Sequence, residues 1–574
     1  MHHAHSSSKC TMSTTQNPRV VIIGGGLGGI TTAINLKRRL GFHNFVIYEQ
    51  SDDIGGTWKH NTYPGAASDV GTHWYSLSTD LNPDWPVTHV TQPGLLAYWR
   101  SLAKKYDLYP NIFCDTKVIS AIWDDQRQIY NVKVQDLKTK EIRDDYANVL
   151  VSAIGILSVP QYPNELKGIS TFRGAHFHSA EWDHSVDLHN KRVAVIGNGC
   201  SASQLLSIIT QDPTTEVVNF CRSPHWMLTT VPSGEFSPWQ RWVFRNVPLA
   251  ARIYRDWTFL GHELLYLTVV GASDNSYFKR KLTEKMTKTI KEYAPVKYHD
   301  RIIPDYPMGC KRLIFGTGYL EALQRPNMDL NYEGIEQIVE DGIVTKNGKK
   351  ERFDVIIFAT GFNTLDYPLE VRGQGGISVQ EYYDKKGGPE AYYGTALPNF
   401  PNFYTVAGPN TTTGHGSVVF VEETQLHWAM KLIRPVLKGD ASSFVPTEAS
   451  SEAHNKKIQS ELGKSVWAGG CVSWYRRPGS DKIHTNYPGC LTKFWWNMRE
   501  PVWKDFKVVN GKNWRIKRTV VKVTNGAIVL ASLIILAKRL GRLNNLDFWT
   551  LRDFAVDHIV SLGITALNVV RSIL

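Results

Sequence analysis

The chain contains 574 residues, of which 42% are hydrophobic and 21% are charged. This composition supplies a buried core and excludes a mainly disordered, collagen-like or coiled-coil protein. The 65 Lys and Arg residues outnumber the 53 Asp and Glu residues, and this surplus fits nucleic acid, an anionic membrane surface or a polyanionic cofactor equally well. The sequence contains no nucleic-acid-binding motif, so we expect no such partner. At roughly 100–200 residues per domain, the length predicts two to four domains.

Seven cysteines are widely spaced, and none of them forms a CxxC or CxxxxC pair. A disulfide scaffold, a zinc finger or a dithiol reductase requires such paired spacings, so the pattern indicates a reducing compartment. Cys200 and Cys310 are interpreted as packing residues, because no base is spaced to activate either thiol. The histidines form no HExxH motif, and we expect no metal site.

A first βαβ unit is predicted near the N-terminus. Residues 1–18 are polar and contain no apolar stretch, so we expect no secretory signal and a cytoplasmic protein. Residues 19–23 form a β-branched run that ends in glycines and is typical of a buried parallel strand. A helical stretch at 30–40 and a strand at 45–48 complete the unit, and residues 149–155 add another core strand.

The same pattern starts again at residues 192–197 and reaches a second strand at 217–221. A third strand that ends in glycine covers residues 354–361. The aromatic-rich region between them, residues 239–293, is predicted to be a helical insertion. Strands that alternate with helices predict a doubly wound α/β architecture.

The C-terminal tail differs in composition from the rest of the chain. Residues 526–537 are almost purely apolar and have basic residues on both sides. As a helix they would span about 18 Å, less than the roughly 30 Å hydrocarbon core of a bilayer. A second apolar segment covers residues 554–574. Contact of this tail with an intracellular membrane surface and docking on the protein itself both stay open.

The first motif is Gly24-x-Gly26-x-x-Gly29, which lies between a predicted strand and a predicted helix. Gly24 permits a tight turn, Gly26 lets the backbone approach a pyrophosphate, and Gly29 allows close packing of the helix on the strand. Glu49 ends the second strand, where a carboxylate can accept hydrogen bonds from a ribose diol. Strand, helix and acid together predict a dinucleotide site.

The second motif is Gly197-x-Gly199-x-x-Ala202, and its second strand is followed by Arg222 and Ser223 rather than by an acid. A cation and a hydroxyl suit a 2′-phosphate, which a glutamate would repel. The first site therefore fits FAD and the second fits NADPH, although Arg222 could also be a solvated surface charge. We expect two Rossmann-like dinucleotide-binding domains.

Two longer motifs each fix five or more positions. One is Phe172-x-Gly174-x-x-x-His178-x-x-x-Trp182-Asp183, and the other is Gly55-Gly56-Thr57-Trp58 followed by Tyr63-Pro64-Gly65 and Asp69. Both resemble signatures of the type I Baeyer–Villiger monooxygenases, which belong to the flavin-containing monooxygenase superfamily. In the related N- and S-oxidising enzymes the tryptophan of the first motif is usually tyrosine or phenylalanine. The resemblance covers about residues 19–410 and continues more weakly to about residue 506.

The resemblance also implies roles for individual residues. Arg312 would be the catalytic arginine over the flavin, and Asp69 would be the carboxylate that holds it. Lys311 would join Arg222 and Ser223 on the 2′-phosphate.

Further roles follow from the two longer motifs. Thr57 and Trp58 would contribute to the FAD site, as would Asp69. His178 and Trp182 would lie in the hinge between the domains, where they matter for coupling but do not react.

The resemblance implies a function as well. The chain would be an NADPH- and oxygen-dependent flavoprotein that converts a bulky apolar ketone to an ester or lactone by way of a peroxyflavin. A flavin monooxygenase that hydroxylates nitrogen, sulfur or carbon is the alternative, and an uncoupled NADPH oxidase is a more distant one. The identity of the ketone and the oligomeric state have no signal in the sequence.

The predicted organisation is an α/β fold with a discontinuous FAD domain and an inserted NADP domain. Its segments are a polar N-terminus (1–18), the first segment of the FAD-binding domain (19–158), the NADP-binding domain (159–355) with a helical insertion at about 235–295, the second segment of the FAD-binding domain with substrate-pocket loops (356–515), and a basic, apolar helical tail (516–574).

Overall fold

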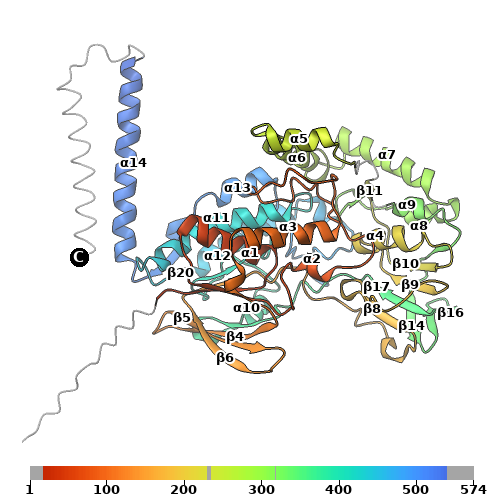
Figure 1. The fold of residues 1–574 in the computed structure, drawn as a ribbon. Helices are drawn as coiled ribbons and strands as arrows, with labels where there is room; N and C mark the ends of the chain where they lie inside the picture. Colours follow the sequence, from red (N-terminus) through yellow and green to blue (C-terminus); the bar gives the residue numbers. More distant parts are fainter. Residues whose placement is uncertain (1–16, 229–233, 317, 540–574) are drawn as a thin grey trace, which may run out of the picture.

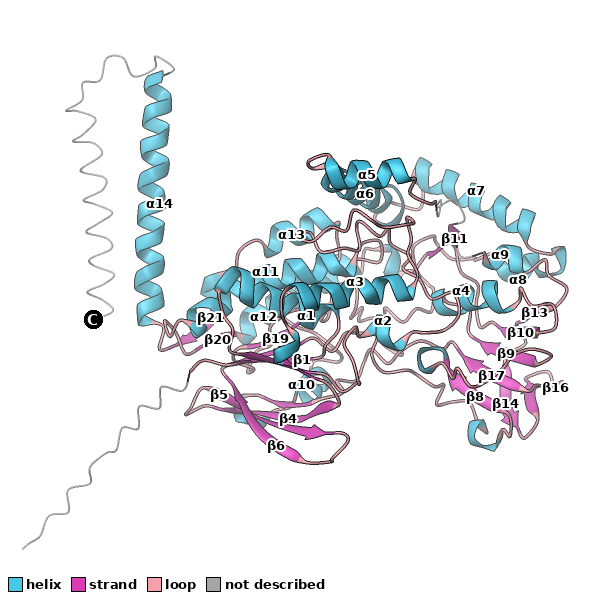
Figure 2. Ribbon diagram, viewed as in Figure 1, coloured by secondary structure: helices cyan, strands magenta, loops and turns pink. Residues whose placement is uncertain are grey.

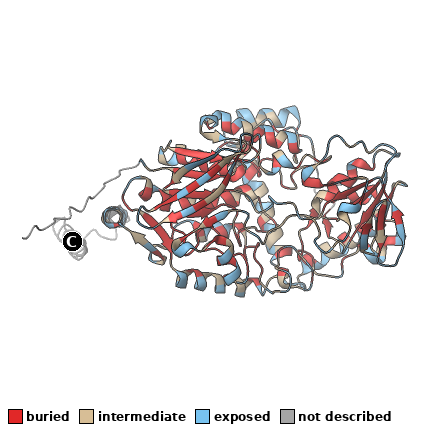
Figure 3. Cartoon of the chain, turned by 90° about the horizontal axis from the view of Figure 1, so that it is seen from below, coloured by how far each residue is buried: buried red, intermediate tan, exposed pale blue. Residues whose placement is uncertain are grey.

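The computed structural model describes residues 17–228, 234–316 and 318–539. Within these residues, two parallel β-sheets of five strands each form the centres of two bodies that lie side by side (Figures 1 and 2). Buried residues concentrate around these two sheets (Figure 3). The structure therefore confirms the predicted α/β class.

The first sheet has the strand order β19-β7-β1-β2-β3, and its neighbouring strands are parallel. Its strands are β1 (Val20–Ile23), β2 (Phe45–Tyr48), β3 (Ile112–Phe113), β7 (Val149–Ser152) and β19 (Phe403–Thr405). The predicted strands at 19–23, 45–48 and 149–155 correspond to β1, β2 and β7. Because β19 follows the second body in the chain, the first body is discontinuous in sequence.

Alternate residues of β1 pack against two different layers. Val20 and Ile22 share a core with helices on one face of the sheet, and Val21 and Ile23 share another core with an antiparallel sheet on the other face. The helices are α1 (Leu27–Asn35), α3 (Gln92–Lys105) and α11 (Val418–Leu437). The other layer has the strand order β18-β4-β5-β6, in which β4 (Thr116–Asp124), β5 (Ile129–Asp136) and β6 (Ile142–Ala147) are antiparallel and β18 (Glu370–Arg372) runs parallel to β4. Burial on both faces explains the continuous apolar run of β1.

The second sheet has the order β13-β10-β9-β17-β8, again with parallel neighbours. Its strands are β8 (Ala175–His178), β9 (Arg192–Ile196), β10 (Glu216–Phe220), β13 (Met328–Asn331) and β17 (Val355–Phe358). Val193 and Val195 face helix α4 (Cys200–Ile209), and Ala194 and Ile196 face an antiparallel sheet. That sheet consists of β14 (Ile335–Val339), β15 (Gly342–Thr345) and β16 (Lys350–Arg352). In both bodies a β-layer takes one of the faces that a doubly wound pattern assigns to helices.

The aromatic-rich insertion is helical, as the sequence predicted. It contains α5 (Pro238–Asn246), α6 (Ala250–Leu265), a π-helical turn (Tyr266–Val270) and α7 (Tyr277–Tyr293). These helices run along the top of the molecule in Figure 1. Short elements complete this region and the motif loops: α2 (Thr57–His60), α8 (His299–Ile302), α9 (Tyr319–Ala322), β11 (Met227–Leu228) and β12 (Ile314–Phe315).

The C-terminal region returns to the first body and ends in a long helix. Its elements are α10 (Val379–Lys385), β20 (Ser443–Pro446), α12 (Glu448–Leu462), α13 (Leu491–Met498), β21 (Phe506–Val509) and α14 (Lys512–Arg539). Trp514 packs edge-on against Phe444 and anchors the base of α14, which then rises beside the body (Figure 1). Among the described residues, no helix combines the length and apolarity needed to cross a bilayer. Residues 1–16 and the apolar segment 554–574 lie outside the described residues.

Candidate active site

The first glycine turn joins β1 to α1. Gly24 has a φ of +102°, which disfavours residues with a side chain, and its N–H donates to the Tyr48 carbonyl at 2.8 Å. A Cβ on Gly24 would lie 2.6 Å from the Ala153 carbonyl oxygen, and one on Gly29 would collide with the Gly24 carbonyl oxygen. Both positions therefore need glycine, as the motif predicted.

Glu49 lies buried directly beside this turn. Its Oε2 accepts a hydrogen bond from the Gly25 N–H at 2.6 Å, and its Oε1 accepts one from the Ser51 N–H at 2.8 Å. Gly56 lies so close to Gly26 that a Cβ on Gly56 would be 2.8 Å from the Gly26 Cα. This contact brings Thr57, at the start of α2, next to the turn.

The second turn repeats the first in the other body. Gly197 has a φ of +110°, its N–H donates to the Phe220 carbonyl at 2.9 Å, and a Cβ there would collide with the Ala359 carbonyl oxygen. Ala202 is fully buried where α4 packs on the sheet. A Cβ on Gly199 would meet no atom within 4 Å. The backbone is thus approachable at this turn, and the residues there fit a pyrophosphate.

Three predicted phosphate ligands meet beside the second turn. Lys311 Nζ donates to Ser223 Oγ at 2.6 Å, although the two residues are far apart in sequence. Burial and the charge of Arg222 lower the pKa of Lys311 to about 8. Two cations and a hydroxyl therefore lie close together, and a bound phosphate would relieve their mutual repulsion.

Arg312 and Asp69 form an ion pair, as the family motif implied. Both Nη2, at 2.5 Å, and Nε, at 3.2 Å, donate to the same carboxylate oxygen, Oδ2. Nη1 donates to the Gly414 carbonyl at 2.6 Å. Burial opposes the charge of this guanidinium, but the Asp69 carboxylate outweighs it, so the pKa of Arg312 is raised. The side chain is held in one orientation and stays charged.

Glu263 of α6 holds the backbone next to the Arg312 site. Its carboxylate accepts hydrogen bonds from the backbone N–H groups of Leu491, at 2.7 Å, and Thr492, at 3.2 Å, and lies 4.0 Å from His415 Nε2. Burial works against its ionisation, but these donors hold the pKa of Glu263 at about 2. Because His415 follows Gly414, Glu263 connects α6 and α13 to the arginine site. No motif or spacing in the sequence indicates this contact.

The expectation of unpaired cysteines is wrong for one pair, and Cys310 is not merely a packing residue. Cys310 forms a disulfide with Cys471, 161 residues further along the chain. A pair this distant has no recognisable spacing, and the close approach exists only in the folded chain. The bond fastens the residue before Lys311 to the loop that contains Tyr475. Cys200, in contrast, is free, and burial raises the pKa of its thiol to about 11, which agrees with a packing role.

Comparison with known proteins identifies the family. The model for flavin-binding monooxygenase-like proteins matches residues 17–248. A Baeyer–Villiger monooxygenase of Pseudomonas aeruginosa is 34% identical over 493 residues, which cover 85% of this chain and 91% of that protein. The FAD-binding monooxygenase ktnD of Aspergillus niger is 33% identical over 508 residues, covering 85% of this chain and 81% of the relative. The chain belongs to the Baeyer–Villiger monooxygenases.

Solved structures agree with this assignment at the level of the fold. The structure of OTEMO in complex with FAD and NADP has a TM-score of 0.75 at 23% identity and covers 86% of this chain and 99% of its own. A closed cyclohexanone monooxygenase has a TM-score of 0.73 at 24% identity, with 86% and 99% coverage. This monooxygenase depends on FAD and takes its electrons from NADPH, so the predicted family, enzyme class and cofactors are confirmed.

His178 contacts the segment that returns to the first body, whereas Trp182 packs within the second body. His178 is fully buried at the end of β8, and its ring lies 5.9 Å from that of Phe362 in the returning segment. Burial lowers the pKa of His178 to about 4, so the ring is neutral near pH 7. Trp182 packs edge-on against Phe177 at 5.1 Å. The hinge role of the two residues stays a prediction.

A pocket opens at the carboxyl ends of β7 and β19 in the first body. Ile154, Tyr367, Ala407 and His484 are among the residues that line it. Ligands of parallel sheets bind at this end of the strands. The pocket therefore lies at the end of the first sheet where a ligand is expected.

Proposed function

We propose that this monooxygenase inserts one atom of dioxygen between the carbonyl carbon and a neighbouring carbon of a bulky, apolar ketone, giving an ester or lactone. The second oxygen atom leaves as water, and NADPH supplies the two electrons. The proposal is supported by the names of the relatives, and above all by one observation: the guanidinium of Arg312 is fixed by Asp69 and by the Gly414 carbonyl.

Arg312 is the proposed catalytic residue. A positive charge that is fixed before the reaction stabilises negative charge that develops on oxygen as the carbonyl is attacked. Asp69 positions this charge and keeps it from moving with the substrate. Bound FAD, once reduced by NADPH, supplies the oxygen-activating chemistry.

The remaining predicted ligands are proposed to hold the two cofactors. Glu49 accepts hydrogen bonds from the ribose of FAD, and the first glycine turn faces its pyrophosphate. At the second turn, Arg222, Ser223 and Lys311 bind the 2′-phosphate of NADPH. The open space beside Gly199 and the cation cluster support this assignment.

The bulky, apolar nature of the ketone is proposed from the side chains around Arg312. Its guanidinium lies 5.6 Å from the centre of the Phe315 ring. Tyr475 is buried nearby, and burial raises the pKa of its hydroxyl. The positive charge of Arg312 lowers that pKa in part, which shows that the two side chains lie close together. Aromatic side chains beside the catalytic charge favour a large apolar substrate over a small polar one.

Product analysis with isotopically labelled dioxygen tests the proposal. We expect a bulky ketone to yield an ester that carries one labelled oxygen, with one NADPH consumed per ester. A sulfide and an amine of similar size serve as competitors. Oxidation of the sulfide or amine while the ketone stays unchanged would favour the hydroxylating alternative.

We also propose that the C-terminal tail touches a membrane surface. From Lys512 to Arg539 the sequence contains seven Lys and Arg residues and no Asp or Glu. Exposed apolar side chains such as Ile528, Leu533 and Leu536 follow the basic first turns of α14. This combination supports binding at the interface of a bilayer rather than passage through it.

A further inference from the structure

Helix α6 has an apolar stripe on its outer face as well as on its inner face. On the inner side, Tyr254 and Phe259 pack against aromatic rings of the first body. On the outer side, four apolar residues of α6 and one of the following π-helical turn continue at helical spacing and are 46 to 72% exposed: Ile253, Trp257, Leu260, Leu264 and Leu267. A surface helix of a soluble protein normally presents polar residues there.

The neighbouring helices enlarge this surface. Trp239 and Trp242 of α5 are exposed and stack on each other, with ring centres 5.0 Å apart and planes inclined by 9°. Tyr277 and Phe278 are exposed at the start of α7. We name these four aromatic residues together with the outer stripe of α6 the α5–α7 face. Large apolar residues exposed on three neighbouring helices are typical of an interaction site.

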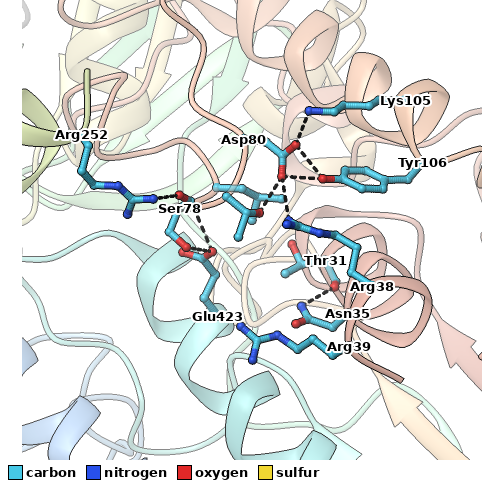
Figure 4. Close-up of polar contacts among 12 residues, drawn as sticks. Thr31, Asn35, Arg38, Arg39, Ser78, Asp80, Lys105, Tyr106, Arg252 and Glu423 are labelled. Carbon is cyan, nitrogen blue, oxygen red and sulfur yellow. Dashed lines mark hydrogen bonds and ion pairs between the residues drawn. The ribbon is translucent and has the colours of Figure 1, made fainter. Parts of the chain in front are cut away.

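Polar contacts prevent α6 from turning its outer stripe inward. Arg252 donates to the Ser78 carbonyl, and Arg255 Nη2 lies 3.4 Å from Glu423 Oε2 of α11. Glu423 also accepts hydrogen bonds from the Ser78 N–H and hydroxyl, as Figure 4 shows around Ser78. Together with the contact between Glu263 and the start of α13, these contacts fix which side of α6 faces outward.

Cations border the α5–α7 face. Lys285 and Lys288 are exposed along α7, whereas Lys281 beside them pairs with Glu284 and Arg245 on α5 pairs with Asp84. Trp side chains with neighbouring Lys and Arg residues are typical of helices that lie in the headgroup region of an anionic bilayer. A symmetric contact with a second copy would instead bring the lysines of both copies to one interface, where they would repel each other.

We propose that the α5–α7 face binds the surface of an anionic phospholipid bilayer, with α6 lying in the plane of the membrane. Figure 1 shows α5, α6 and α7 along the same side of the molecule toward which α14 rises. The inference on the α5–α7 face rests on observations independent of α14 and of the reaction.

Vesicle sedimentation with the full-length, FAD-loaded protein tests this inference. We expect binding to vesicles of phosphatidylcholine with phosphatidylserine, and weaker binding to phosphatidylcholine alone. Replacing Trp257 and Leu264 by serine should lower the partition constant by about tenfold or more, because apolar surface no longer enters the interface. Ile142→Ser is the matched control, since Ile142 is 56% exposed on β6 at the opposite side of the molecule.

Charge variants and the tail separate the remaining outcomes. The double variant K285Q/K288Q should weaken binding only to vesicles that contain phosphatidylserine. The inference is overturned if the Trp257 and Leu264 variant binds like the wild type, or if adding the Trp257 and Leu264 changes to L533S/L536S causes no further loss of binding. It is also overturned if the wild type ignores both vesicles while light scattering shows a dimer that the Trp257 and Leu264 variant cannot form.

Discussion

The two glycine turns of this monooxygenase share a backbone and differ in charge. In each turn the first glycine donates its N–H to the last carbonyl of the neighbouring strand, Tyr48 in one body and Phe220 in the other. The first turn is completed by a buried carboxylate, Glu49, whereas the second lies next to Arg222 and Lys311. Under the proposed cofactor contacts, the shared backbone geometry provides a pyrophosphate site, and the residues after the second strand determine whether a ribose or a phosphate is bound.

Two adjacent residues connect these sites. Lys311 reaches Ser223 at the second turn, and Arg312 reaches Asp69, which follows the motif loop of the first body. Single substitutions can therefore change the contacts of one glycine turn while the other turn stays intact.

The largest loss of activity is expected when Arg312 is replaced. Arg312→Ala removes the fixed positive charge, so ester formation should fall by about 10²- to 10³-fold while NADPH is still oxidised. The measurement is the yield of ester per NADPH consumed. Arg19→Ala is the matched control, because Arg19 also pairs with a carboxylate, Asp145, in a part-buried site away from the cofactors. Undiminished ester yield in Arg312→Ala would rule out the catalytic role.

A smaller effect is expected when the first turn loses its charge. Glu49→Gln keeps the shape of the side chain but removes charge-assisted hydrogen bonds, so FAD affinity should fall by about a hundredfold. Fluorescence titration of the apoprotein with FAD measures it. Asp144→Asn, at an exposed carboxylate on β6, should leave FAD affinity unchanged. If both variants bind FAD equally well, Glu49 is not a ribose ligand.

At the second turn the expected change is one of selectivity. Arg222→Ala should weaken NADPH binding by about thirtyfold and NADH binding very little, because only NADPH has a 2′-phosphate. Steady-state kinetics with the two cofactors measure the ratio. Arg301→Ala removes another exposed cation of the same body and should not change it. Equal losses for NADPH and NADH would contradict the assignment.

Both turns could be predicted from sequence because their requirements are local. Gly24 and Gly197 are recognisable since a strand, a positive φ and a following helix must occur at fixed spacing. The Lys311 and Arg312 contacts were reached only through the family resemblance. Nothing local connects Arg312 to Asp69, which lies 243 residues earlier in the chain.

The features that sequence could not predict depend on distant segments meeting in the fold. Cys310 and Cys471 have no shared motif, and Glu263 contacts His415 and α13 only because the insertion folds back over the first body. The outer stripe of α6 has a helical period, but period alone does not reveal which of two apolar faces is buried. That distinction needs the contacts of Arg252 and Arg255.

The smallest effect concerns the titration of Lys311. Burial and Arg222 lower its pKa to about 8, so the ammonium that is proposed to bind the 2′-phosphate is present below that pH and is lost above it. NADP affinity should therefore fall as the pH rises through about 8, by no more than about tenfold per pH unit for a single proton. The phosphate adds no step in this range, because its second pKa lies near 6. Calorimetric titration with NADP across this range, with NAD as the control, measures the slope, and Lys311→Gln should flatten it; an unchanged slope in that variant would assign the titration to another group.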